Sequence, residues 1–173
     1  MESARPVAGA LATRHALSDW ITVNDLLSLR EALVRGSLPH DFLEKLRGLA
    51  GGDISHRFIE QNCSLFAALL LAAESGFFRD VKPAERERLL RVLAYVRKDG
   101  DAIPDSFAGG FKDDQREVLA ASIELGTLLQ RFKAWRLRHQ VPAMWSNHEH
   151  NRQHASTLAL SVAAGSTSPE ERP

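Results

Sequence analysis

Apolar residues recur at every third or fourth position through most of the chain between residues 22 and 138, which is the spacing of one face of an α-helix. No stretch between two turn signals alternates apolar and polar residues for long enough to compete as a β-strand. The pattern therefore predicts an all-α fold, a single-domain bundle of about five helices. Their expected starts lie at Thr22, Pro39, Asp53, Pro83 and Asp114.

Residues that favour helix ends mark the boundaries of these predicted helices. Thr22 can cap the first helix, with Asp25 in its first turn, and Asp53 can start the third. Pro39 and Pro83 suit a first helical turn, where the missing N–H has no partner to lose. Glycines that break the periodicity predict the ends: Gly36, Gly51-Gly52, Gly76 and Gly100.

The third predicted helix differs from the others because its second half is apolar on every side. Leu65–Ala73 is an uninterrupted apolar run of nine residues. A helix without a polar face must be surrounded, so we expect it at the centre of the bundle. The run is too short for a membrane span, which needs about 20 residues.

The last predicted helix is the longest. Asp114 and Glu117 have the spacing of a capping box, and an apolar stripe continues through Val118 and Leu125 to Trp135. We therefore expect one long C-terminal helix that packs along its whole length.

The two ends of the chain lack this periodicity. Residues 1–16 are expected to form a flexible N-terminus, 17–145 the helical bundle, and 146–173 a polar, histidine-containing C-terminal tail. The weakly apolar stretch 7–12 is too short for the core of a secretory signal.

The charges of the chain balance, with 22 basic and 22 acidic residues. No global excess would attract nucleic acid or an anionic membrane over a distance, which argues against nucleic acid as the main partner. The single cysteine, Cys63, cannot form an intrachain disulfide and lies in an apolar stretch. A cytoplasmic location fits this cysteine usage best.

One segment carries a family-like pattern. Tyr95 lies near the end of the fourth predicted helix and is followed by Asp101-Ala102-Ile103-Pro104-Asp105, then by Gly110 and by Asp113-Asp114. This pattern resembles the signature of the YkvA-like family, small bacterial proteins grouped as a domain of unknown function, over about residues 93–120. The resemblance implies a helical hairpin and no particular activity.

The same segment concentrates carboxylates. Asp101, Asp105, Asp113 and Asp114, with Asp99 beside them, could converge on a hard divalent cation such as Mg²⁺ or Ca²⁺, which prefers oxygen ligands. The spacing is not that of an EF-hand. The alternative is structural, because aspartates of this kind also cap helices and stabilise turns.

A second candidate metal site lies in the C-terminal tail. His148, His150 and His154 fall within a few residues of each other, and His150 and His154 would share one face of a helix at a zinc-ligand spacing. The segment lacks a nearby cysteine and the order of a metalloprotease motif, so a solvated polar tail is the alternative.

A basic stretch, 131–139, ends the last predicted helix. Lys133, Arg136 and Arg138 could contact the phosphates of a nucleic acid. Basic residues at a helix C-terminus also stabilise the helix dipole, and no helix-turn-helix pattern supports sequence-specific reading of DNA.

Motifs for catalysis are missing from the sequence: it has no nucleophile elbow, phosphate-binding glycine loop or Cys-x-x-Cys pair. His56 and Glu60 could form a polar cluster near Asn62 and Cys63, although a satisfied polar face at the helix start is the favoured explanation. A strong core pattern without a chemical motif favours a non-enzymatic protein-interaction module, of a regulatory, adaptor or effector-like kind, whose partner is another protein or a second copy of the chain. The alternative is a metal-binding protein or a metal-dependent enzyme that uses the acids of 99–114 or the histidines of 148–154, and a third possibility is nucleic-acid binding through 131–139. The expected cofactor is none, with a divalent metal as the alternative.

Overall fold

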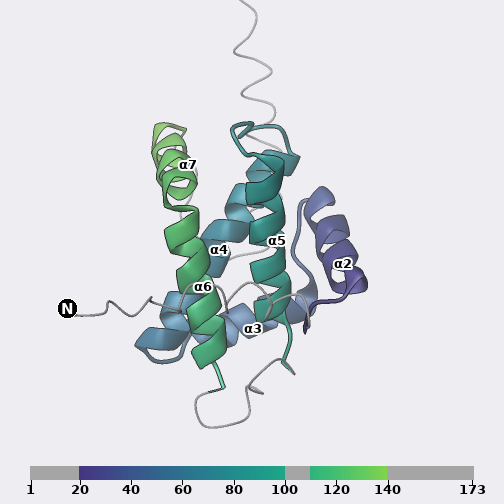
Figure 1. Cartoon of the computed structure of the whole chain (residues 1–173), viewed down its shortest axis with the longest axis vertical. Coiled ribbons are helices and arrows are strands. Elements are labelled where there is room, and N and C mark those ends of the chain that lie inside the picture. Colours follow the sequence, from purple (N-terminus) through teal and green to yellow (C-terminus); the bar gives the residue numbers. More distant parts are fainter. Residues whose placement is uncertain (1–19, 100–109, 140–173) are drawn as a thin grey trace, which may run out of the picture. The chain divides into compact units, whose positions relative to one another are not determined.

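A computed structural model of the chain describes residues 20–99 and 110–139, and these ranges consist of helices and short connections (Figure 1). No β-strand occurs within them, so the predicted all-α fold is confirmed. The helices are α2 (Val23–Val34), α3 (His40–Ala50), α4 (Ile54–Glu74), α5 (Pro83–Arg97), α6 (Lys112–Glu124) and α7 (Gly126–Arg138).

Local capping explains where several of these helices begin and end. The Thr22 side chain accepts a hydrogen bond from the Asp25 N–H, and the Asp25 carboxylate accepts one from the Thr22 N–H at 2.8 Å, as the sequence predicts. Asp53 caps α4 in the same reciprocal way with His56. Gly36 and Gly76 follow α2 and α4 at φ of 76° and 74°, a left-handed conformation that glycine adopts without strain.

α4 is the central helix, as its apolar second half predicts. It contacts α2, α3, α5 and α6, and Figure 1 shows α5 between α2 and α6. Phe66, Leu69, Leu70 and Cys63 of α4 are fully buried. No helix in the described part of the chain is both long and apolar enough to cross a membrane.

The single long C-terminal helix is not observed, because two helices, α6 and α7, take its place. They meet at Leu125, whose φ of −100° and ψ of 15° depart from helical values, and α7 begins at Gly126. Glycine is a poor helix former, so the chain bends here at little cost. The apolar stripe continues across the bend because Val118, Leu125 and Phe132 are all buried.

The predicted capping box of Asp114 and Glu117 is also wrong. α6 begins at Lys112 without a side-chain cap, so both acids lie inside the helix rather than at its start. Both are buried there, on the face that α6 turns towards the rest of the bundle.

The domain limits predicted at residues 16 and 146 lie outside the described residues. The described helices all belong to the first of two units into which the chain divides, Met1–Val141.

Candidate functional site

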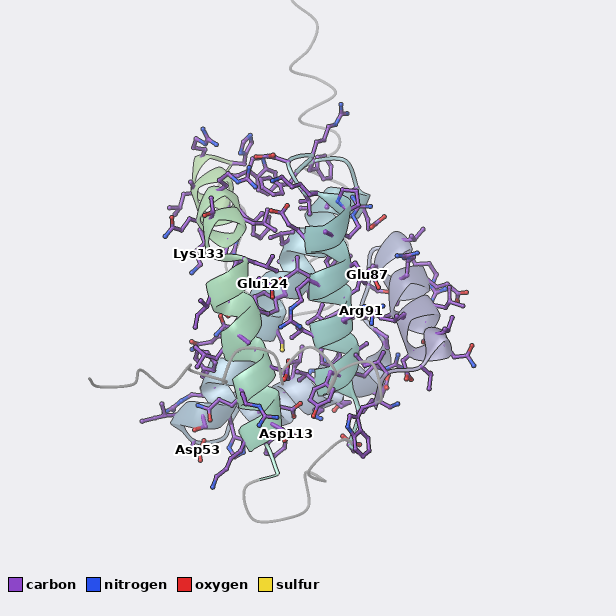
Figure 2. The ribbon with its side chains drawn as sticks, viewed as in Figure 1. Asp53, Glu87, Arg91, Asp113, Glu124 and Lys133 are labelled. Carbon is purple, nitrogen blue, oxygen red and sulfur yellow. The ribbon has the colours of Figure 1, made fainter. Side chains whose placement is uncertain are left out.

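Three acids of α6 are buried instead of exposed. Asp113, Asp114 and Glu117 share the inward face of the helix with Val118 and Ala121, since positions three and four apart fall on one side. Figure 2 labels Asp113 near the lower end of α6. Buried carboxylates require charged or hydrogen-bonding partners, and these come from other helices.

Asp113 and Asp114 meet partners from α5 and α3. The Tyr95 hydroxyl donates a hydrogen bond of 2.8 Å to Oδ2 of Asp113. Oδ2 of Asp114 lies 3.8 Å from Nζ of Lys45, which also donates a 2.7 Å hydrogen bond to the backbone carbonyl of Lys98. These contacts join three helices around buried charge.

Glu117 forms a second buried pair at the interface of α5 and α6. Its Oε2 lies 3.8 Å from Nη2 of Arg88, whose Nε donates a 2.9 Å hydrogen bond to Glu124. Burial raises the pKa of Glu117, and the charges of Arg88 and Arg116 offset part of this effect. The interface therefore holds a carboxylate that takes up a proton more readily than an exposed glutamate.

Only part of the predicted aspartate metal site lies within the described residues. The described residues contain no group of three or more side chains arranged to hold a metal ion. Asp113 and Asp114 lie within the contacts above, while Asp101 and Asp105 lie outside the described residues, as do His148, His150 and His154. Both metal sites stay predictions.

The three basic residues predicted to contact phosphates, Lys133, Arg136 and Arg138, are not all on the surface. Lys133 and Arg138 are exposed, but Arg136 is buried, with its guanidinium carbon 5.9 Å from the centre of the Phe132 ring. Burial lowers the pKa of Arg136. Arg136 therefore belongs to the packing of α7 rather than to its exposed surface.

The polar residues near the start of α4 are engaged separately. Glu60 accepts a 2.8 Å hydrogen bond from the Ser64 hydroxyl, and His56 caps the helix with Asp53. Cys63 is completely buried, and burial raises the pKa of its thiol well above the ordinary value. A thiol in this environment is unreactive, as expected from its apolar surroundings.

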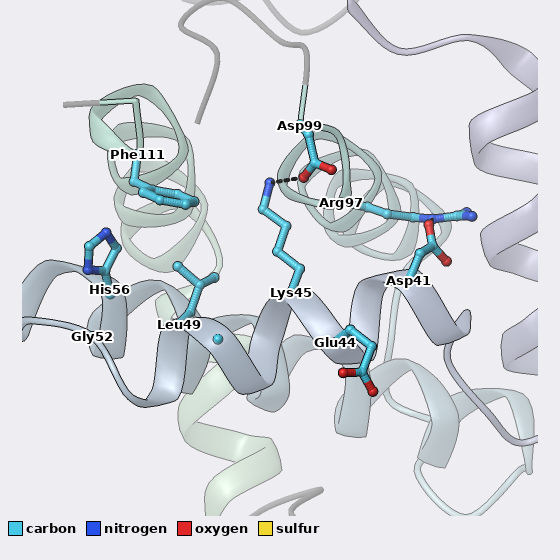
Figure 3. A pocket seen from close by; sticks show the side chains of 10 residues that line it. Asp41, Glu44, Lys45, Leu49, Gly52, His56, Arg97, Asp99 and Phe111 are labelled. Carbon is cyan, nitrogen blue, oxygen red and sulfur yellow. Dashed lines mark hydrogen bonds and ion pairs between the residues drawn. The ribbon is translucent and has the colours of Figure 1, made fainter. Parts of the chain in front are cut away.

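The structure also contains a groove that sequence reasoning missed. A pocket of about 540 Å³ opens where α3, the start of α4, the end of α5 and the start of α6 meet (Figure 3). Six lining residues come from one face of α3 and the turn after it, at spacings of three and four positions. The lining, which we call the α3 groove, consists of Asp41, Glu44, Lys45, Gly48, Leu49, Gly52, His56, Arg97, Asp99 and Phe111.

One end of the α3 groove is aromatic and apolar. The rings of His56 and Phe111 meet edge to face with centroids 4.7 Å apart, and Leu49 lies beside them in Figure 3. Gly52 allows this arrangement, because a Cβ at this position would lie 2.5 Å from Nδ1 of His56. Gly48 leaves the wall open, since a Cβ there would meet nothing within 4 Å.

The other end of the α3 groove is charged. Arg97 donates a 2.7 Å hydrogen bond to Asp41, and Lys45 lies 3.6 Å from the Asp99 carboxylate. Burial opposes ionisation of Asp41, but the contact with Arg97 outweighs it and holds the pKa of Asp41 below its usual range. The one sequence signal that could have indicated this site is Gly48, a glycine inside a helical pattern. Glycine makes a helix less stable than alanine does, so its presence there suggests a packing or functional reason.

In comparisons with known proteins, no family model, no curated protein and no solved structure matches this chain. The resemblance of residues 93–120 to the YkvA-like family therefore stays a prediction. The α3 groove is the feature of the described residues on which a functional argument can rest.

Proposed function

We propose that this protein is a non-enzymatic helical module that binds another protein, and that the α3 groove is its binding site. The observation that carries the proposal is the open groove of about 540 Å³, which combines an apolar end with a charged one. Such a mixture of side chains provides both contact area and orientation for a partner.

The buried ionisable groups support the same proposal. Asp113, Asp114 and Glu117 contact Tyr95, Lys45 and Arg88 respectively across helix interfaces. These contacts account for the acids as parts of the fold. His56, the imidazole that lines the groove, accepts a hydrogen bond from the Asp53 N–H and so helps to start α4.

Native mass spectrometry of the full chain, purified gently from its own source, tests the proposal. We expect a complex with a polypeptide for the natural sequence and its loss for Gly48→Leu, because a leucine side chain would occupy the mouth of the groove. The matched control is Leu137→Gln, which changes an exposed leucine on α7. Neither variant should lower the unfolding temperature of the natural chain.

Retention of the partner by Gly48→Leu would show that the α3 groove is not the binding site. A mass of one metal ion per chain, lost on treatment with a chelator, would instead favour the metal-binding alternative through Asp101, Asp105 or the histidines of the tail. Binding of nucleic acid through Lys133 and Arg138 would weaken steeply as salt is raised.

The proposed location of this module is the cytoplasm. Its single buried cysteine forms no intrachain disulfide, and disulfides are what an oxidising compartment would stabilise. A bacterial source follows only if the resemblance of residues 93–120 reflects common descent. Fluorescent tagging in the source cell would test the location.

A further inference from the structure

The outer face of α6 is apolar at one end and basic at the other. Leu119 and Ile123 are exposed at 47% and 74%, although both are large hydrophobic residues. Lys112 and Arg116, nearer the start of the helix, are exposed as well. The four positions follow one another at spacings of four, three and four residues, so at 3.6 residues per turn they lie within about 60° of each other around the helix axis. We call them the α6 stripe.

The two cations of the α6 stripe are not engaged by the protein itself. Neither Lys112 nor Arg116 has an ion pair or a side-chain hydrogen bond within residues 20–99 and 110–139. The buried acids of α6 turn inwards, and Glu124 accepts a hydrogen bond from Arg88 on the side that faces α5 (Figure 2). The stripe therefore carries two exposed cations, and no carboxylate is paired with either.

This combination of charge and apolar surface separates the candidate partners. A second copy of the chain would bring further cations to the contact and no carboxylate to pair with them. A nucleic acid would use the cations but would leave Leu119 and Ile123 beside its phosphates. α6 also carries no aromatic residue of the kind that anchors an interfacial helix in a membrane. A partner helix with acidic residues beside an apolar stripe satisfies both halves of the surface, because such stripes pack at the same spacing.

We propose that the α6 stripe docks an amphipathic helix of a protein partner whose apolar stripe is bordered by aspartate or glutamate. The apolar side chains pack on Leu119 and Ile123, and the carboxylates lie beside Lys112 and Arg116. The contact covers about three turns of helix, a size that suits a reversible complex. None of these residues lines the α3 groove, so this is a second interaction surface, and the inference goes beyond the proposed function.

The test uses two blocked peptides, each made of two copies of a heptad. The acidic heptad is Glu-Leu-Ala-Ala-Leu-Glu-Ala, and the basic one is Lys-Leu-Ala-Ala-Leu-Lys-Ala. They are titrated into the full ¹⁵N-labelled chain at low salt, and amide shifts are followed by NMR. We expect the acidic peptide to move the Leu119 and Ile123 signals and to bind about tenfold more tightly than the basic peptide, since the basic peptide meets like charge. Raised salt should weaken the acidic peptide.

Matched variants separate the charged half of the stripe from its apolar half. Arg116→Gln should weaken the acidic peptide by about twofold to fivefold, the range for one exposed ion pair. Leu119→Gln should weaken it by about fivefold to tenfold, because the half-exposed leucine loses its apolar contact. The controls are Arg35→Gln on α2 and Leu137→Gln on α7, exposed residues outside the stripe, which should leave the affinity unchanged.

Equal or tighter binding of the basic peptide, or acidic-peptide shifts that Arg116→Gln and Leu119→Gln leave unchanged, would overturn the inference. Tighter binding of phosphatidylserine vesicles or of a thymidine oligonucleotide at the same signals would overturn it in favour of a membrane or a nucleic acid. Concentration-dependent shifts without peptide would do so in favour of a second copy. Gly48→Leu should leave the acidic peptide bound, so failure of the α3 groove and failure of the α6 stripe are distinguishable.

Discussion

The interface between α5 and α6 and the α3 groove use the same kinds of side chain for different purposes. At the interface, Asp113 and Glu117 are buried and contact Tyr95 and Arg88. In the groove, by contrast, the carboxylates stand exposed around an open space. A buried charge depends on its partner, whereas water screens an exposed charge, so that its ion pair contributes little to stability.

Lys45 connects the two regions. Its Nζ lies 3.8 Å from the buried Asp114 and 3.6 Å from the exposed Asp99. One cation therefore has a structural contact on its inner side and a groove contact on its outer side. Substituting Asp99 and Asp114 separately shows how much each contact of Lys45 contributes to the stability of the fold.

Asp114→Asn should cause the largest loss of unfolding free energy. Removing one member of a buried ion pair leaves the other charge in the interior, which costs about 3–5 kcal/mol of unfolding free energy. The matched substitution Asp99→Asn removes an exposed carboxylate from the same lysine and should cost less than about 1 kcal/mol. Urea unfolding measures both, and equal losses would refute the division of roles.

Tyr95→Phe should cause the next largest loss of unfolding free energy. It deletes the hydroxyl that donates to buried Asp113, and a hydrogen bond to a charged group contributes about 1.5–3 kcal/mol. A double-mutant cycle with Asp113→Asn isolates this contact. Additive losses in urea unfolding would mean that the two side chains act independently.

The two glycines of the groove should respond in opposite directions. Gly48→Ala should stabilise the protein by about 0.5–1 kcal/mol, because alanine favours the helix and its Cβ has open space. Gly52→Ala should destabilise by about 1 kcal/mol, because its Cβ would collide with His56. Thermal unfolding compares the pair, and a shared direction would contradict the described packing.

The smallest expected effect is the pH dependence that Glu117 gives to the stability of the protein. Its pKa is raised in the folded state above the ordinary 4.5, so the folded protein binds this proton more tightly than the unfolded chain. The stabilisation is complete below pH 4.5 and is lost as the pH rises through the folded-state pKa. Relative to Glu117→Gln, the natural chain should therefore gain stability as the pH falls from 7 towards 5. Parallel unfolding profiles of the two proteins would contradict this assignment.

Much of the fold was predictable because its signals are local. Thr22 with Asp25 starts α2, and Asp53 starts α4, where the sequence indicates. The glycines that follow these two helices mark their ends in the same local way. The apolar second half of α4 likewise predicts a central position, since no face of it suits water. The bend at Gly126 was missed because the apolar stripe continues across it.

The candidate site was not predictable in the same way. The sequence shows Asp113 and Asp114 as a pair of acids, and their local spacing favours capping, with metal binding as the alternative. Only the tertiary structure brings Tyr95 and Lys45 to them from positions 18 and 69 residues earlier in the chain.

The sequence by itself determined the all-α fold, the caps of α2 and α4 and the central place of α4, because periodicity and capping act over one or two turns. The tertiary structure alone decided which acids are buried and which line the α3 groove. The physical reason is that the exposure of a charge, and therefore its role, depends on neighbours that are distant in sequence.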